Sequence, residues 1–308
     1  MRAFLLPDVL VLAGGGILGE AWMMGVLAGI EDGAEVDFRG VESFVGTSAG
    51  SIVAARLASG RAPRRPRDDA LDALEAAEEE AGADGTPLGS ALRTAARWGW
   101  ALSAPLASAA TALGAPGGAL LRAALLARAP SAGRRLDDLH ASLVRSGVRF
   151  DGRLRVCCVD KATGRRVVFG APGAPAATVA DAVVGSCAIP WVFAPVRIGG
   201  RQYVDGGMWS VTNLDAAPAG RQSDVLCLNP SATLAVAMTS PMGAVRQAFR
   251  AAAAVEVQVL RGRGARVRQI GPDRGAGALM GVNLMDPGPA AGVLAAGYRQ
   301  GLALAAQA

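Results

Sequence analysis

Two strand–turn–helix units follow one another within the first 60 residues, and they constrain the fold more than any other feature of the sequence. The first is the apolar stretch that runs into the glycines of LVLAGGGILGEAW (10–22), after which we expect a helix at about 19–31. The second pairs the strand-like VESFVG (41–46) with the helix-like AGSIVAARLAS (49–59). Alternating strands and helices form parallel sheets that helices cover on both faces. The opening therefore predicts an α/β fold with a mainly parallel central sheet.

The same pattern resumes after a long interruption. Strands are predicted at LRVCCVD (154–160), RRVVFG (165–170), RQYVDGG (201–207) and DVLCLN (224–229). Helices are predicted at about 178–187, 240–262 and 289–306. Residues 61–150 contain Ala-rich helical segments broken by Gly and Pro, without a convincing strand. We expect one domain over residues 1–308, in which 61–150 is a helical cap inserted beside the sheet.

Composition and charge exclude several classes of protein. Of the 308 residues 51% are hydrophobic, which excludes a disordered chain. The formal net charge of +5 is carried almost wholly by arginine, and no aromatic residues alternate with the arginines, so nucleic-acid binding is not expected. A solvated surface and an anionic membrane surface remain open as interpretations of the two arginine groups. These groups are Arg61, Arg64, Arg65 and Arg67, and Arg261, Arg263, Arg266 and Arg268.

Several features bear on cellular location. The apolar start MRAFLLPDVLVLAGGG lacks a cleavage site and runs into the glycine turn, so it predicts a strand and not a signal peptide. The four cysteines form no C-x-x-C pair and have no histidine cluster nearby, which indicates buried thiols and no metal site. The uncharged stretch 98–121 is rich in Ala, Gly and Ser, and we expect cap helices that touch lipid through Trp98 and Trp100 instead of a membrane span. We expect a cytoplasmic protein with peripheral membrane contact.

The second glycine turn has the form of a nucleophile elbow. Its five residues are Gly46-Thr47-Ser48-Ala49-Gly50, placed between an apolar strand and an apolar helix. So sharp a turn needs small residues on both sides of the serine, and it projects the hydroxyl from the strand end. The helix N-terminus behind the serine stabilises negative charge. We therefore predict that Ser48 is a nucleophile.

The first glycine turn has two interpretations. Gly14, Gly16 and Gly19 satisfy G-x-G-x-x-G, and the backbone N–H groups of such a turn bind either a dinucleotide pyrophosphate or an oxyanion that forms during a reaction. A dinucleotide fold needs an acidic residue at the end of the second strand. That position is occupied by the candidate nucleophile Ser48. We therefore expect the N–H groups of Gly15 and Gly16 to face an oxyanion beside Ser48.

We predict a carboxylate, and not a histidine, as the proton acceptor for Ser48. The single histidine, His140, flanks an apolar stripe of a predicted helix, and no histidine follows the later acidic candidates as an α/β-hydrolase triad requires. Asp205 ends the apolar strand in YVDGG and precedes Gly206 and Gly207, at the sheet edge where α/β sites assemble. Asp-Gly-Gly is also a plain turn sequence, but a carboxylate in hydrogen-bond reach of a serine can take its proton.

In order and context, these blocks resemble the patatin-like phospholipases, a family of lipid acyl hydrolases related to cytosolic phospholipase A2. The blocks read GGGILG (14–19), GTSAG (46–50) and DGG (205–207), and GSCAIPWVFAPV (185–196) resembles the segment before the family's aspartate strand. The resemblance implies a three-layer α/β/α sandwich with a Ser-Asp dyad. Its site residues would be Ser48 as nucleophile, Asp205 as base and Gly14, Gly15 and Gly16 as the oxyanion loop.

The sequence departs from the family pattern at two positions. Leu18 stands where the family commonly has Arg or Lys, which bears on the preference for anionic head groups. Asn213 fits the family, but Leu214 follows it where many members have proline.

The resulting expectation is a serine hydrolase that cleaves lipid or phospholipid esters through an acyl-enzyme, without cofactor or metal. Acyl transfer by the same dyad and a non-catalytic lipid-binding or membrane-scaffold protein are the alternatives. A dinucleotide-binding protein is a further alternative that the missing ribose acid argues against.

Overall fold

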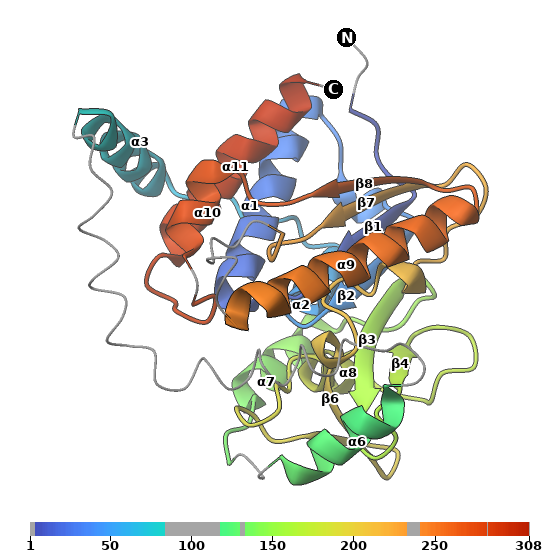
Figure 1. The fold of residues 1–308 in the computed structure, drawn as a ribbon. Coiled ribbons are helices and arrows are strands. Elements are labelled where there is room, and N and C mark those ends of the chain that lie inside the picture. Colours follow the sequence, from blue (N-terminus) through green and yellow to red (C-terminus); the bar gives the residue numbers. More distant parts are fainter. Residues whose placement is uncertain (1–3, 84–117, 130–132, 233–240, 282, 308) are drawn as a thin grey trace.

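The computed structural model describes residues 4–83, 118–129, 133–232, 241–281 and 283–307. Its centre is an eight-stranded sheet of strand order β5-β6-β3-β2-β1-β7-β8, in which β4 pairs with β3 (Figure 1). Strands β1, β2, β3, β7 and β8 are parallel, whereas β4, β5 and β6 run antiparallel to their partners. The strands are β1 Val9–Leu12, β2 Ser43–Thr47, β3 Leu154–Asp160, β4 Arg166–Phe169, β5 Val196–Ile198, β6 Arg201–Asp205, β7 Asp224–Leu228 and β8 Arg266–Ile270.

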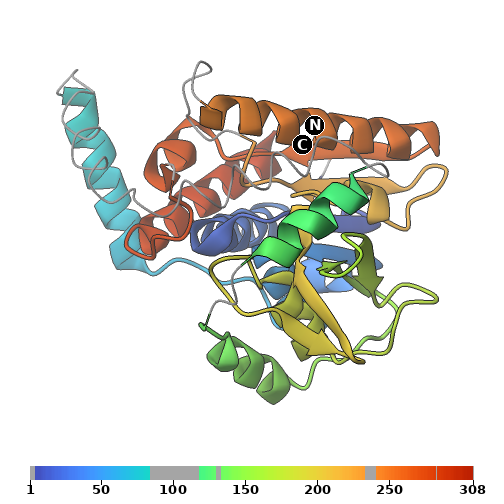
Figure 2. The same cartoon turned by 60° about the horizontal axis from the view of Figure 1, so that its bottom comes forward.

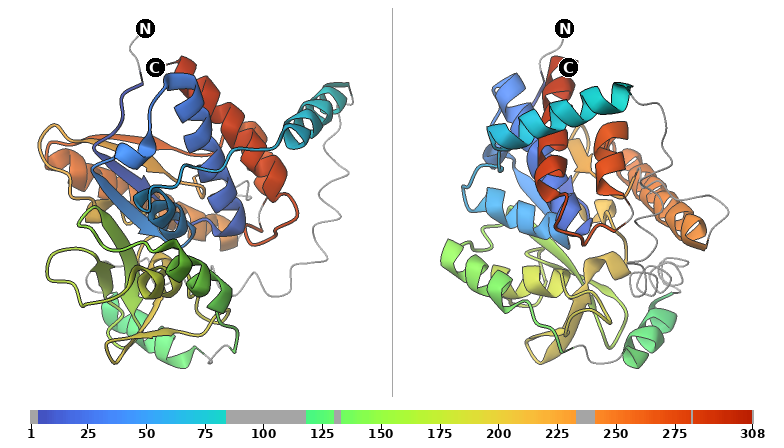
Figure 3. Two further views of the ribbon diagram at one scale, coloured as in Figure 1. Left: turned by 180° about the vertical axis from the view of Figure 1, so that it is seen from behind. Right: turned by 90° about the vertical axis from the view of Figure 1, so that its left-hand side faces the viewer.

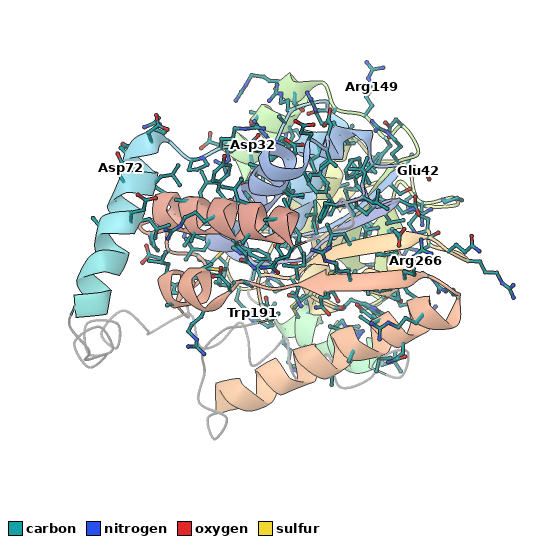
Figure 4. The ribbon with its side chains drawn as sticks, turned by 90° about the horizontal axis from the view of Figure 1, so that it is seen from above. Asp32, Glu42, Asp72, Arg149, Trp191 and Arg266 are labelled. Carbon is teal, nitrogen blue, oxygen red and sulfur yellow. The ribbon has the colours of Figure 1, made fainter. Side chains whose placement is uncertain are left out.

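Helices cover both faces of the sheet, which confirms the three-layer α/β/α fold. The helices are α1 Gly16–Ala34, α2 Ala49–Ala58, α3 Asp68–Ala83, α6 Ala119–Arg128, α7 Asp137–Ser146, α8 Val179–Ser186, α9 Pro241–Gly262, α10 Arg274–Met280 and α11 Ala290–Ala306. Short 3-10 helices lie at Phe38–Gly40, Gly206–Met208 and Leu214–Ala216. Seen from above, α11 and α9 lie on opposite sides of β7 and β8 (Figure 4).

Strand β1 shows why the centre of the sheet is apolar on both faces. Leu10 and Leu12 belong to the core that packs against α1, α2, α8 and α11, while Val9 and Val11 belong to the core under α9. All four side chains are buried, and they have 0 to 3% of their surface exposed. A strand covered on both faces reads as a continuous apolar run instead of an alternation. This is the pattern VLVL of the first strand.

The strands and helices predicted outside residues 61–150 are present, with ends that differ by a few residues. Two strands were not predicted. β5 has only three residues, and β8 alternates arginine with other residues in RVRQI. Its first residue Arg266, labelled in Figure 4, donates to Asp224, the first residue of the neighbouring strand β7, with Nε 2.6 Å from Oδ1. Two members of the second arginine group, Arg266 and Arg268, therefore lie on an edge strand.

The described helices of residues 61–150 lie at three separate places (Figures 1 and 2). α3 extends away from the body and contacts α11, α7 packs on α8, and α6 lies near the turn that follows β6 (Figure 3). The predicted lipid contacts Trp98 and Trp100 fall outside the described residues, so the cap stays a prediction. In the described part of the chain, no helix combines the length and apolarity needed to cross a bilayer.

Candidate active site

The glycine turn and the elbow lie side by side because of the register of three parallel strands. Leu12, the last residue of β1, pairs with Gly46 of β2 on one side and with Leu228 of β7 on the other. The turns that follow β1 and β2 therefore leave the sheet at the same carboxyl edge. A Cβ placed on Gly14 would lie 3.5 Å from the Ser48 Cβ, which puts the glycine turn in contact with the elbow.

The backbone of Ser48 has the strained geometry of a nucleophile elbow. Its φ of 50° and ψ of −125° lie in a region that L-residues rarely adopt. A Cβ on Gly50 would lie 2.0 Å from the Leu12 carbonyl oxygen, and one on Gly46 would lie 2.4 Å from the Ser51 Cα. Both glycines of the motif are thus required by close backbone contact.

A buried serine on α8 holds the elbow in this conformation. The Ser48 N–H donates to the Ser186 Oγ at 2.9 Å, and the Ser186 hydroxyl donates to the Cys157 carbonyl oxygen at 2.7 Å. Ser48 itself is 8% exposed. Backbone strain of this kind persists only where the surroundings fix it, and it is typical of functional sites.

The pairing of β3 brings Asp205 to the elbow. Cys157 of β3 pairs with Thr47 of β2 and with β4, while Cys158 pairs with Asp205 of β6 and with β4. Because β4 occupies one edge of β3 at both residues, β2 and β6 must share the other edge. They run in opposite directions and end opposite adjacent residues of β3. Thr47 and Asp205 are thus the facing ends of two strands, and Ser48 directly follows Thr47.

The carboxylate of Asp205 is buried at this junction. It is 6% exposed, and its Oδ1 accepts the N–H of Gly207 at 2.7 Å. Burial raises the pKa of Asp205 to about 6, although hydrogen bonds from the Ser48 side chain and the Gly207 N–H act in the opposite direction. A Cβ on Gly206 would lie 2.1 Å from the Cys157 carbonyl oxygen, so the turn requires glycine there.

The three glycines of the first turn differ in the availability of their N–H groups. The Gly14 N–H donates to the Val211 carbonyl oxygen at 2.9 Å, so it is already paired. Within the described residues, the N–H groups of Gly15 and Gly16 have no acceptor. They lie at the N-terminus of α1, where N–H groups and the helix dipole favour an anion. Gly16 has a φ of +61°, which favours glycine.

The geometry of the elbow adds one N–H group to this set. Ala49 follows Ser48 as the first residue of α2, and its N–H has no acceptor among the described residues. In a nucleophile elbow, the N–H that follows the nucleophile is a usual donor to the oxyanion. The oxyanion donors that the geometry offers are therefore Gly15, Gly16 and Ala49.

Gly19 and Leu18 have packing roles. A Cβ on Gly19 would lie 3.1 Å from Pro230, which follows β7, so a larger residue would push α1 away from this contact. Leu18 is fully buried in the core against the helices. The position where the resemblance would place a cation therefore faces the protein interior.

Asn213 links the two halves of the site. Its Nδ2 donates to the Thr47 Oγ1 at 3.0 Å and to the Gly206 carbonyl oxygen at 3.3 Å. Its Oδ1 accepts the Nη1 of Arg166 at 3.2 Å, and Arg166 in turn pairs with Asp215. Asn213 thus joins the end of the elbow strand to the turn after Asp205. The only sequence signal for it was its place in the family pattern.

A buried arginine from residues 61–150 supports the same turn, and sequence reasoning missed it. Arg122 of α6 is 1% exposed, and its Nε donates to the Met208 carbonyl oxygen at 3.1 Å. Its Nη1 donates to the Gly164 carbonyl oxygen at 3.0 Å, and its guanidinium lies 4.5 Å from the centre of the Trp209 ring. Residues 61–150 therefore contribute a side chain that supports the loop after Asp205.

Other candidate groups are engaged elsewhere. The Nε2 of His140 lies 3.0 Å from the Asp181 Oδ1 and connects α7 to α8. All four cysteines are free and buried, as predicted, and burial raises the pKa of each thiol. A thiol with a raised pKa is a poor nucleophile at neutral pH.

Comparison with known proteins gives one family match. The family model described as patatin-like phospholipase matches residues 10–218, a range that includes the glycine turn, the elbow and Asp205. A search of curated proteins returned no match. Among solved structures, VipD from Legionella pneumophila is similar at 16% identity and a TM-score of 0.42, covering 99% of this chain and 68% of that chain.

Proposed function

The chain belongs to the patatin-like phospholipase family, whose members are lipid acyl hydrolases, and from this premise we propose that it hydrolyses lipid esters with a Ser-Asp dyad. The observation that carries the proposal is the meeting of Ser48 with a buried carboxylate at the facing ends of β2 and β6. The proposed substrate is a carboxylic ester of a lipid or phospholipid.

In the first half of the reaction, the Ser48 Oγ attacks the ester carbonyl carbon while its proton passes to the Asp205 carboxylate. The carbonyl π electrons move onto oxygen and form a tetrahedral oxyanion. When this collapses, the bond to the alcohol oxygen breaks and the alcohol takes the proton from Asp205. The acyl group remains as an ester of Ser48.

In the second half, water attacks the acyl-enzyme and gives its proton to Asp205. The second tetrahedral intermediate expels the Ser48 oxygen, which recovers the proton, and a fatty acid is released. With a pKa of about 6, Asp205 is mostly ionised at neutral pH and is a stronger base than an ordinary aspartate.

The oxyanion is stabilised by N–H groups that are already in place. Those of Gly15, Gly16 and Ala49 have no acceptor among the described residues, and they lie at the N-termini of α1 and α2. Losing one such donor typically costs about 3 kcal/mol of transition-state stabilisation. The Gly14 N–H instead anchors the loop through Val211.

The test is labelling of the purified chain with a fluorophosphonate probe, followed by mass location of the adduct, and hydrolysis of lipid esters. We expect an adduct on Ser48 that Ser48→Ala removes and Asp205→Asn suppresses. Ser223→Ala is the matched control, since its hydroxyl accepts the Gly220 N–H on the surface. Ester hydrolysis retained by folded Ser48→Ala protein would refute the proposal. Product analysis with an added lipid alcohol separates hydrolysis from acyl transfer.

A further inference from the structure

A cleft with a volume of about 260 Å³ lies between α1, α2, α7 and the segment that follows α2. These helices lie on one side of the molecule (Figure 3). Neither Ser48 nor Asp205 lines this cleft. Its polar wall consists of Glu20, Arg56, Ser59, Arg61, Arg64, Ser142 and Ser146. Its apolar wall includes Met24, Ile52 and Leu143.

The charge in the cleft is strongly positive. Three guanidinium groups face one carboxylate, that of Glu20, which is the only acid among the described residues of the lining. Glu20 accepts from the Arg64 Nη2 at 2.7 Å, which leaves Arg56 and Arg61 without a carboxylate partner in the described chain. Burial lowers the pKa of Arg56, and the nearby charges of Arg64 and Arg61 lower it further. The three cations are thus close enough to repel one another.

Such a cluster suits a ligand with more than one negative charge. Guanidinium groups match phosphate oxygens in geometry, and they bind phosphate through charge-assisted hydrogen bonds. The Ser142 hydroxyl also lines the cleft and can donate a hydrogen bond to an anion. The apolar wall offers contact to the carbon atoms of an ester substituent. We propose that this cleft binds the phosphate group of a phosphate ester.

The cleft begins close to the dyad. Ile52 lies four positions after Ser48 on α2, and Glu20 lies four positions after Gly16 on α1. Four residues make about one helical turn, so the cleft starts about one turn from the elbow and the oxyanion turn. Arg56 comes eight positions after Ser48, a rise of about 12 Å along α2, so a phosphate held by the arginines lies about two turns from Ser48. The binding does not depend on Ser48 as nucleophile, and so it can be tested separately.

The test uses the full chain with Ser48→Ala, so that no substrate is turned over. Glycerol 3-phosphate and inorganic phosphate are titrated by calorimetry, and flotation is measured with phosphatidylcholine vesicles with and without phosphatidic acid. Arg61→Gln with Arg64→Gln should weaken binding about tenfold or more, because charge-assisted hydrogen bonds are lost. Arg197→Gln with Arg274→Gln removes the same charge from exposed positions elsewhere and should leave binding unchanged.

A variant with the opposite expected effect keeps the proposal falsifiable if the arginine variants fold poorly. Glu20 competes with a bound phosphate for Arg64, so Glu20→Gln should tighten binding several-fold. Binding of the soluble esters assigns the site to a free phosphate ester, and binding of phosphatidic acid vesicles alone assigns it to a lipid head group. The proposal is overturned if no probe binds, if Glu20→Gln weakens binding, or if the control pair weakens it equally.

Discussion

Replacing the buried carboxylate of the dyad by its neutral isostere should make the protein inactive and more stable. In the folded chain burial raises the pKa of Asp205 from 3.8 to about 6. The folded state therefore binds the proton more tightly than the unfolded state, and stability falls as the pH rises through this interval. A shift of about two units corresponds to about 3 kcal/mol. Asp205→Asn removes this penalty while keeping an oxygen that can accept the Gly207 N–H.

The size of the effect depends on pH, and denaturation at two pH values measures that dependence. Below pH 3.8 Asp205 is neutral in both states, and above pH 6 the full penalty applies. We expect Asp205→Asn to raise the free energy of unfolding by up to about 3 kcal/mol at pH 8 relative to its effect at pH 4, measured by urea denaturation. Asp224→Asn is the control, because its salt bridge with Arg266 lowers the pKa of Asp224.

The reasoning is refuted if the difference in stability between Asp205→Asn and the wild type does not change with pH. It is equally refuted if the variant loses stability relative to the wild type as the pH rises. Either result would mean that burial does not raise the pKa of Asp205 in the folded chain, and the basicity assigned to the carboxylate would have no physical origin.

Three further outcomes follow from the site. For ester hydrolysis, log kcat/KM should fall with unit slope below the Asp205 pKa of about 6, because the protonated carboxyl cannot act as base. About a tenth of the activity should remain at pH 5. A profile that is flat from pH 5 to 8 would exclude Asp205 as the base. Asn213→Ala should lower kcat about tenfold or more with little change in KM, because it removes the hydrogen bonds that join Thr47 to the turn after Asp205. An unchanged kcat in steady-state assays would contradict this role. Arg122→Met should lower the free energy of unfolding by about 3 kcal/mol, because two buried carbonyl oxygens lose donors. Denaturation midpoints equal to those of the wild type would argue against this supporting role of Arg122.

What could be predicted from the sequence was local. The strand before Ser48, the small residues around it and the apolar strand that ends at Asp205 are each recognisable from a few neighbouring residues. The distant side chains that hold these segments in place are not recognisable in this way. Asn213 reaches Thr47 across 166 positions and Arg122 reaches the Met208 carbonyl across 86, and no short pattern encodes such contacts.

The strands β5 and β8 were not predicted because their residues show no apolar pattern typical of a strand. The three residues of β5 are too few to show a period. The arginines of β8 interrupt the apolar alternation by which a strand is recognised, although an edge strand accepts them and Arg266 pairs there with Asp224. The free N–H groups of the oxyanion turn depend on tertiary structure as well. Only the folded chain shows that Val211 occupies the N–H of Gly14 and leaves that of Gly15 open.

Because β2 and β6 share one edge of β3, catalytic activity requires that both strands pair with β3 in the observed register. β2 and β6 meet opposite adjacent residues of β3, and slipping either strand by one position would turn its side chains to the opposite face of the sheet. A misaligned chain could be compact and still lack a working dyad. The register is set by β2, β3 and β6, so the length of the connection between α2 and α6, residues 59–118, does not enter it. That connection can lengthen or shorten while the dyad keeps its place.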